Sequence, residues 1–229
     1  MLNGLNVVDI VLWFAVFLFS LAFHESAHAW TSERFGDSTA RYLGRVTLNP
    51  IPHIDPIGTV LLPIIGMVTG GMMIGWAKPT PVNPMLWTDK KKANILVSAA
   101  GPISNTILAA IAFVILKVLI SGGILDWPKK ATLFYLAGPP GDQASLLVPI
   151  SKLLSILLSL NIMLGIFNLF PVPPLDGSHV LESLLPPPIL EAYEQIRPFG
   201  FILLIALLYL GVFSFFFDPI MRLVVHLLY

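Results

Sequence analysis

The sequence predicts an all-α polytopic membrane protein, with about four transmembrane helices and one further membrane-inserted element. The first observation is composition. Of the 229 residues, 56% are hydrophobic and 11% are charged, and the mean hydropathy is +0.84, whereas soluble domains carry about a quarter charged residues. The second observation is clustering, because the apolar residues form several runs close to the roughly 20 residues that a bilayer-spanning helix needs.

Four apolar runs have the length of a membrane span. They cover approximately residues 6–31, 93–120, 149–170 and 198–228. The last run holds a candidate kink at Asp218 and Pro219. No Lys or Arg precedes Arg34, so the first run lacks the basic start of a signal peptide, and we expect it to be retained as a span.

The chain is expected to form a single membrane domain over residues 1–229. Its core is predicted to cover about residues 6–181. Residues 182–229 are predicted to add an amphipathic segment, broken by three consecutive prolines, that lies at the membrane interface and leads into the last span.

The run from 57 to 77 differs in composition from the four spans. It contains five residues that disfavour a straight helix: Pro63, Gly66, Gly70, Gly71 and Gly75. The preceding residues 41–48 carry β-branched and aromatic side chains around a glycine and are expected to be extended. We therefore predict that residues 41–80 form a re-entrant, membrane-inserted hairpin or a short β element. Irregular backbone is tolerated at membrane depth where protein or a watery cavity surrounds it.

A His-Glu-x-x-His motif lies inside the first span. His24 and His28 are four residues apart, so on a helix both imidazoles lie on one face, about 6 Å apart along the axis. Two such imidazoles can bind one zinc ion, and Glu25 beside them can act as general base on a zinc-bound water. Ionisable side chains are costly in an apolar helix and usually mark a function. The chain has no cysteine, so any further ligand must be His or carboxylate.

A catalytic zinc site usually takes three protein ligands and leaves the fourth position to water. The carboxylates weighed as third ligand are Glu33, Asp55, Asp126, Asp176 and Asp218. Asp176 is favoured because three prolines end the third span rigidly and Gly177 permits a tight turn, which together hold the carboxylate at one place. The alternative interpretation of these residues is an ordinary Asp-Gly turn.

The positions of the cations predict which side of the membrane the site faces. Seven of them fall between the first and second spans: Arg34, Arg41, Arg45, Lys78, Lys90, Lys91 and Lys92. Cytoplasmic loops are enriched in Lys and Arg, which predicts an N-terminus outside and His28 toward the cytoplasmic end of its span. Asp176 can then reach His28 only if the run 57–77 enters and leaves the membrane on the same side.

These motifs resemble the site-2 protease family, peptidase family M50, and in particular its compact prokaryotic branch without PDZ or CBS domains. The most specific match is the pairing of residues 24–28 with residues 168–177, which resemble the family's Asn…Pro-x-x-Asp-Gly element. Residues 101–105 resemble its Gly-Pro-x-x-Asn stretch, and residues 48–56 and 75–79 resemble the compact branch.

The resemblance implies an activity and a set of residue roles. His24, His28 and Asp176 match the ligands of one Zn²⁺ per chain, and Glu25 matches the catalytic glutamate. Asn168 matches an asparagine that holds the substrate backbone or the developing oxyanion. Asn105 is a candidate either for helix packing or for substrate contact. The implied activity is zinc-dependent intramembrane endopeptidase cleavage, as in regulated intramembrane proteolysis.

The expected partners are the transmembrane helix of a substrate protein and the lipid bilayer, and a homo-oligomer or a regulatory membrane partner remains open. The formal net charge is zero, which gives no indication of a nucleic-acid partner. The resemblance and the charge bias together predict a multi-pass protein of a prokaryotic plasma membrane, with its active site toward the cytoplasm.

Three other functions are compatible with parts of this pattern. A catalytically silent membrane zinc protein or chaperone of the same fold would not need Glu25. A metal transporter would carry His or carboxylates on several spans, whereas here they converge on one point. A membrane zinc protease that cleaves soluble or prenylated proteins would take a Glu as third ligand, and no suitable Glu-rich helix follows the motif.

Overall fold

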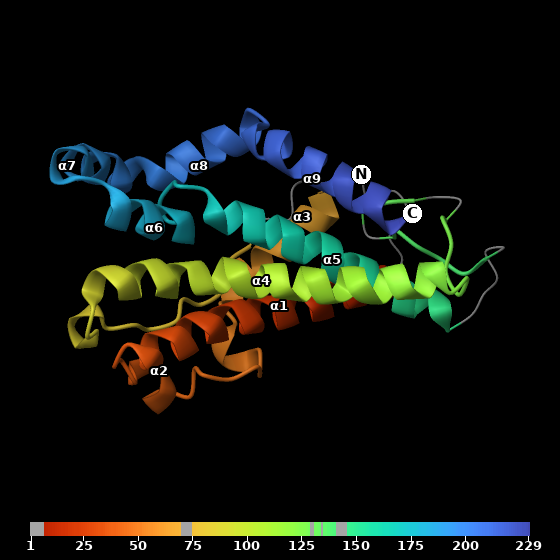
Figure 1. Ribbon diagram of the computed structural model, residues 1–229, viewed down its shortest axis with the longest axis horizontal. Helices are drawn as coiled ribbons and strands as arrows, with labels where there is room; N and C mark the ends of the chain where they lie inside the picture. Colours follow the sequence, from red (N-terminus) through yellow and green to blue (C-terminus); the bar gives the residue numbers. More distant parts are fainter. Residues whose placement is uncertain (1–6, 70–74, 129–130, 134, 141–145) are drawn as a thin grey trace.

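The computed structural model describes residues 7–69, 75–128, 131–133, 135–140 and 146–229. Within these ranges the fold is all-α and contains no sheet, as the sequence predicts. The long helices lie side by side along the longest axis of the molecule (Figure 1). Four helical stretches are long and apolar enough to cross a membrane.

Helices α1 (Val7–Arg34), α4 (Lys90–Ser121) and α5 (Leu147–Leu169) form the centre of the molecule. Helix α4 packs against both of the others, and α1 also packs against α5. Apolar side chains surround these helices instead of following one face, which is typical of helices buried in a membrane or a large core. Asp89 caps α4 by accepting a hydrogen bond from the backbone N–H of Lys92 at 3.0 Å.

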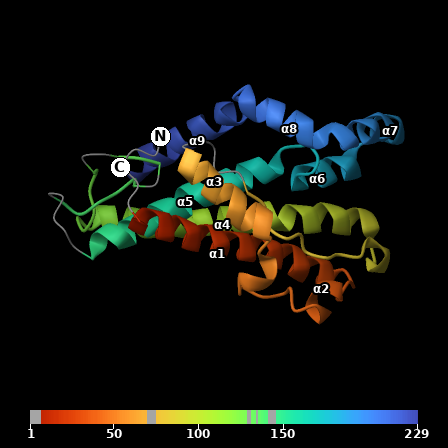
Figure 2. The same cartoon turned by 180° about the vertical axis from the view of Figure 1, so that it is seen from behind.

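The direction of the chain alternates along this bundle. Helices α1 and α5 run the same way and α4 runs back, as the colours in Figures 1 and 2 show. Consequently α2 (Thr39–Tyr42), the start of α4 and α6 (Asp176–Leu184) lie at one end of the molecule, and the loop after α4 lies at the other. This is the arrangement that the topological argument for Asp176 requires.

Two clusters of buried apolar side chains hold the bundle. One joins α1 to α5 and includes Trp13, Phe17 and Leu160. The other joins α4, α5 and α9 (Val212–Leu228) and includes Leu158. Trp13 and Phe17 stack with ring centroids 4.8 Å apart. Close packing of this kind is what associates helices in a membrane, and it sets the position of α1 and its His-Glu-x-x-His motif against the other two helices.

The fourth apolar stretch has bounds other than the predicted 198–228. Helices α7 (Pro187–Ile196) and α8 (Gly200–Tyr209) are joined by the short η5 and together form the stretch Pro187–Tyr209. The segment predicted to lie at the membrane interface is therefore partly included in this stretch. A proline in the first turn of a helix removes no intrahelical hydrogen bond, so Pro198 does not end the helical path.

The last predicted span, 198–228, is interrupted before it reaches the candidate kink at Asp218 and Pro219. Pro219 lies inside α9, and the chain breaks earlier, at Gly211 between α8 and α9. The φ of Gly211 is 72°, in the left-handed region that glycine enters without a steric cost. This break turns the chain so that α9 packs on α4 and α5.

The run from 57 to 77 returns to the place from which it starts. It leaves through η2 (Pro56–Leu61) and α3 (Leu62–Thr69), and it comes back without helical structure after residue 75. The backbone N–H of Trp76 donates to Gly58 O at 3.2 Å, and that of Lys78 donates to His53 O at 2.9 Å. The two ends of the run thus lie side by side, as a re-entrant element requires. Gly70 and Gly71 lie outside the described residues.

The alternative of a short β element is wrong for the described part of residues 41–80, where no strand occurs. Residues 41–48 are not extended either. Thr39–Tyr42 form the helical turn α2, and Gly44, with φ of 67°, reverses the chain so that the N–H of Arg45 donates to Ala40 O at 2.8 Å. Local turn formation at the glycine prevails over the β preference of the flanking side chains.

Candidate metal centre and active site

His24 and His28 occupy one face of α1, one turn apart. Their side chains are almost fully buried, with relative exposures of 6% and 8%. The two Nε2 atoms are 3.0 Å apart. Each Nδ1 faces an acceptor oxygen: His24 Nδ1 donates to Asn105 Oδ1 at 2.7 Å, and His28 Nδ1 donates to Val97 O at 2.6 Å. Both imidazoles therefore turn the Nε2 atom toward the same point.

Asp176 reaches that point from the far end of the chain. It is the first residue of α6, where the positive end of the helix dipole favours a carboxylate. Its Oδ2 lies 3.2 Å from His24 Nε2 and 3.4 Å from His28 Nε2. Gly177 is required next to it, because a Cβ there would lie 2.2 Å from the carbonyl oxygen of Leu169. The end of α5 and the start of α6 are thus packed tightly enough to hold the carboxylate in place.

The donor set fits a zinc ion. Ligand atoms of His24, His28 and Asp176 all lie within 4.8 Å of one another. With both Nδ1 atoms donating, the Nε2 atoms of neutral imidazoles present lone pairs, and these face each other and a carboxylate oxygen that accepts no hydrogen bond. Such an arrangement is repulsive unless a cation lies between the three atoms. Zinc–ligand distances of about 2.0–2.2 Å at tetrahedral angles imply about 3.3–3.6 Å between ligands, close to the observed separations.

Helix α4 approaches this centre at Gly101, the only glycine of this helix. A Cβ at Gly101 would lie 2.4 Å from both His24 Cε1 and His28 Nε2. A glycine is therefore required at position 101, because the backbone of α4 itself forms a wall of the site.

Glu25 lies next to His24, and its carboxylate is held by the returning limb of the re-entrant element. The backbone N–H of Thr80 donates to Glu25 Oε2 at 2.8 Å, and the Thr80 hydroxyl donates to the backbone O of Glu25 at 3.0 Å. Sequence reasoning missed Thr80, because a backbone N–H has no signature in a sequence. The two bonds join the predicted general base to the limb that follows residue 75.

Arg45 holds the returning limb of the re-entrant element in place. It is 6% exposed, and its guanidinium donates to Lys78 O at 2.6 Å, to Pro79 O at 2.9 Å and to Pro52 O. Burial lowers the pKa of Arg45, and the nearby Glu25 carboxylate opposes that shift. In the sequence this residue counted only as a topological cation, whereas in the structure it ties both ends of the re-entrant element together.

The two asparagines predicted as substrate contacts occupy different positions. Asn105 is 0% exposed and lies behind His24, where its amide also donates to Asn161 Oδ1 at 2.8 Å. This placement favours positioning of His24 over contact with a substrate. The Asn168 amide donates to Leu164 O of its own helix at 3.0 Å, and in the described part of the chain it makes no hydrogen bond to the three ligands or to Glu25.

Three other His and Asp residues, His53, Asp55 and His179, do not belong to the cluster of ligand atoms. Burial lowers the pKa of His53, and the hydrogen bond that its Nε2 donates to Thr47 O at 3.0 Å opposes that shift. Asp55 caps η2 by accepting hydrogen bonds from the backbone of residues 57 and 58. His179 lies on α6, with Nδ1 3.2 Å from Glu182.

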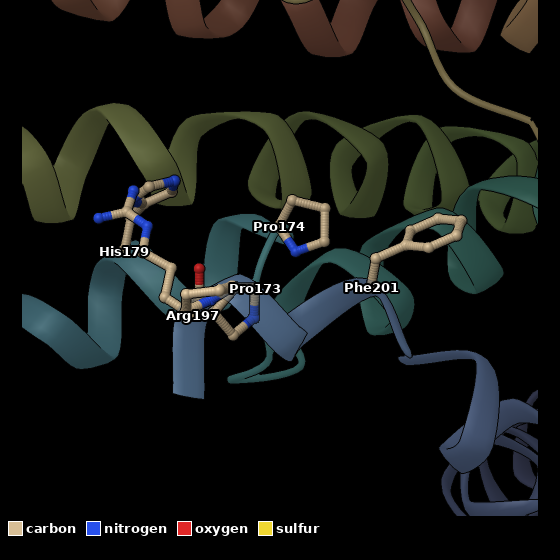
Figure 3. A pocket seen from close by; sticks show the side chains of 7 residues that line it. Pro173, Pro174, His179, Arg197 and Phe201 are labelled. Atoms are coloured by element: carbon tan, nitrogen blue, oxygen red, sulfur yellow. The ribbon is translucent and has the colours of Figure 1, made fainter. Parts of the chain in front are cut away.

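A cavity of about 260 Å³ adjoins the turn that carries Asp176 (Figure 3). It is lined by residues of this turn, of α6, of η5 and of α8: Pro173, Pro174, Ser178, His179, Arg197, Pro198 and Phe201. The turn therefore has room on one side, while its other side packs against α5.

Comparisons with known proteins show which family the chain resembles. A family model described as "Peptidase family M50" matches residues 12–207. "Putative zinc metalloprotease YwhC" of Bacillus subtilis is 38% identical over 188 residues, which are 82% of this chain and 75% of that protein. "Putative zinc metalloprotease Rip2" of Mycolicibacterium smegmatis is 28% identical over 198 residues, 86% of this chain and 66% of that protein. The Mycobacterium tuberculosis protein of the same name is 29% identical over 204 residues, 89% and 67% of the two chains. No solved structure gives a significant match.

Proposed function

The chain belongs to peptidase family M50 and is a multi-pass membrane protein with zinc as its cofactor, and from this premise we propose that it hydrolyses peptide bonds within the membrane. The observation that carries the proposal is the convergence of His24, His28 and Asp176 on one point beside Glu25. His24 lies ten residues before the end of α1, about 15 Å along the helix axis. The site is therefore enclosed by the bundle at a depth that a membrane-embedded peptide can reach.

Each residue of the site has a definite task in this reaction. The zinc ion, when bound, activates a water molecule and polarises the scissile carbonyl. His24, His28 and Asp176 would hold the ion through their Nε2 and Oδ2 atoms, with Glu25 next to His24 in the chain. Glu25 accepts the proton of the attacking water and delivers it to the leaving amine. The Thr80 N–H stabilises the ionised carboxylate and directs one of its oxygens, which keeps the base in a fixed orientation.

The substrate proposed for this site is the transmembrane helix of another membrane protein. A helix shields its scissile carbonyl by intrahelical hydrogen bonding, so it must unwind locally before Glu25 can act on it. The freed backbone groups need partners inside the membrane. Residues 75–83 form no helix or strand, and the backbone N–H of Thr80 binds Glu25, so we propose that this segment pairs with an unwound peptide by strand addition.

The cation distribution supports a cytoplasmic orientation of the site. Six of the seven Lys and Arg residues between the first and second predicted spans stand at the end of α1, in or just after α2, or at the start of α4, and these elements meet at the end of the molecule where α6 lies (Figure 1). We propose a bacterial plasma membrane as the location, with the N-terminus outside, because cytoplasmic loops carry the excess of Lys and Arg. A second copy or a regulatory membrane protein is a further proposed partner.

The test compares isosteric variants of the purified protein in lipid vesicles with a single-span model substrate. We expect Glu25→Gln to retain zinc and to lose cleavage by a factor of roughly 10²–10⁴, the usual contribution of a general base. His28→Ala and Asp176→Ala should lose both zinc and cleavage. Glu33→Gln is the matched control, since it removes a carboxylate of the same helix that pairs with Arg41 at the surface. Cleavage by Glu25→Gln at the control rate would refute the assignment.

A further inference from the structure

Four buried polar side chains form a continuous hydrogen-bonded chain behind the zinc ligands. It runs from Ser20 to Asn161 of α5, to Asn105 of α4, and back to His24 of α1. Asn161 Nδ2 donates to Ser20 Oγ at 2.9 Å, Asn105 Nδ2 donates to Asn161 Oδ1 at 2.8 Å, and His24 Nδ1 donates to Asn105 Oδ1 at 2.7 Å. Ser20, Asn105 and Asn161 are each 0% exposed. Water cannot replace a missing partner in such a chain, so every member must be satisfied by the others.

The direction of every bond in this chain follows from one group whose polarity is fixed. Asn161 Nδ2 also lies 2.8 Å from the backbone O of Leu157, and a backbone carbonyl can only accept. The atom near Leu157 must therefore be the NH₂ group, which leaves Asn161 Oδ1 to face Asn105. Asn105 must then donate to Asn161 through its own NH₂, so its Oδ1 faces His24. His24 Nδ1 must carry the proton, and Nε2 presents its lone pair to the metal position.

We propose that Asn161 and Asn105 form a relay that sets the tautomer and the ring orientation of His24 for zinc binding. The tautomer of His28 is set directly, because its Nδ1 donates to the backbone carbonyl of Val97 at 2.6 Å. His24 has no such carbonyl among its hydrogen-bond partners in the described residues, and the two amides transmit the polarity of the Leu157 carbonyl to it instead. Asn105 and Asn161 are positioning residues in this scheme, since neither contacts the metal position.

The relay rests on the proposed metal site and makes a prediction that packing alone does not make. If Asn105 acts through its hydrogen bonds, a neutral carboxylic acid can replace its amide, because it can accept from His24 Nδ1 and donate its O–H to Asn161 Oδ1, whereas an apolar side chain of the same size can do neither. If Asn161 acts only through Asn105, its loss has no further effect once Asn105 is gone. Residues that act along one path are non-additive in zinc affinity in this way, whereas residues that act on the site independently have additive effects.

The experiment measures the zinc dissociation constant of the full chain in detergent by competition with a chelator, together with the visible spectrum of the cobalt-substituted protein. Loss of a hydrogen-bond partner of a ligating His typically costs about 10–100-fold in metal affinity, and we expect that loss for Asn105→Leu. Asn105→Asp should bind zinc within about threefold of wild type. Asn161→Leu should be intermediate, and the double variant Asn105→Leu with Asn161→Leu should equal Asn105→Leu alone.

Ser159→Ala is the matched control on α5. Its hydroxyl is buried to 1% exposure and donates to Leu133 O, away from His24, so zinc affinity should be unchanged. The relay is refuted if Asn105→Asp weakens zinc as much as Asn105→Leu, or if the effects of the two leucine substitutions add. Should Asn105→Leu fail to fold, Asn105→Asp and Asn161→Leu still decide between these outcomes. His24→Ala separates the relay from the site itself, because wild-type zinc affinity in that variant would refute the metal site.

Discussion

Gly101→Ala tests whether the backbone of α4 must contact the zinc ligands. The new Cβ would lie 2.4 Å from His24 Cε1 and from His28 Nε2, whereas ordinary van der Waals contact begins near 3.4 Å. The rings or the helix must therefore move apart by about 1 Å. Zinc sites tolerate deviations of about 0.2 Å in their ligand distances, so a displacement of that size is incompatible with three ligands on one ion.

The substitution has opposing effects on the protein without zinc. Alanine is favoured over glycine in a helix by about 0.8–1.0 kcal/mol, and overpacking costs about 1–3 kcal/mol, so the apo protein should lose at most about 2 kcal/mol. The larger effect is on zinc. A free zinc concentration 100 times the wild-type Kd stabilises the folded state by about 2.7 kcal/mol, and a tenfold weaker site leaves about 1.4 kcal/mol at the same concentration.

The assay is thermal unfolding in detergent with and without a chelator, combined with the metal content of the purified protein. Gly165→Ala is the control, since a Cβ there meets Thr106 Oγ1 and Pro102 O at 3.4 and 3.5 Å, which is ordinary contact. That variant should keep the full zinc-dependent stabilisation. A Gly101→Ala protein with the same zinc-dependent stabilisation as the control would refute the inference that α4 touches the ligands at this residue.

Two further predictions concern groups outside the metal ligands. Thr80→Pro removes the N–H that binds the Glu25 carboxylate, and a hydrogen bond to a charged group contributes about 1.5–3 kcal/mol. Cleavage should therefore fall roughly ten- to 100-fold while the zinc content stays unchanged. Thr80→Ser is the control, and wild-type turnover of Thr80→Pro would contradict the prediction. Asp37 is 0% exposed, and although burial opposes ionisation, hydrogen bonds from Thr39 and the backbone N–H of Asn83 hold its pKa below the ordinary value of 3.8. A depressed pKa stabilises the fold above the ordinary pKa, and this stabilisation is lost as pH falls through the lower, folded-state pKa. Asp37→Asn should therefore reduce the acid dependence of the unfolding temperature between pH 6 and 3. An unchanged acid dependence would contradict the assignment.

The sequence predicted the three converging ligand positions because each has a local signature. His24 and His28 are related by helical spacing, and Asp176 stands in a proline-rich turn after a span. These features depend on short-range geometry, which a single sequence displays. The placement of Asp176 beside the histidines additionally needed the argument from cation distribution, and the structure has the required arrangement of helix ends.

The parts that the sequence did not predict depend on contacts between distant residues. The bond from Asn105 to His24 joins positions 81 residues apart, and the bond from Thr80 to Glu25 joins positions 55 apart. The break at Gly211 was not predicted, because a glycine in an apolar run ends a helix only where tertiary packing, here that of α9 on α4 and α5, favours the turn. Propensity identifies the residues that can end a helix, whereas tertiary contacts select among them.

The distance in sequence between the ligands also has a consequence for biosynthesis. His28 belongs to α1, whereas Asp176 follows 148 residues later in the chain. Chains are synthesised from the N-terminus at about 5–20 residues per second, so the nascent protein carries two of its three proposed ligands for several seconds before the third exists. During that interval it cannot assemble the proposed three-ligand centre, even though the motif and the general base are already in the membrane. Assembly of the proposed centre is thereby deferred until α5 has been inserted and α6 has begun to form.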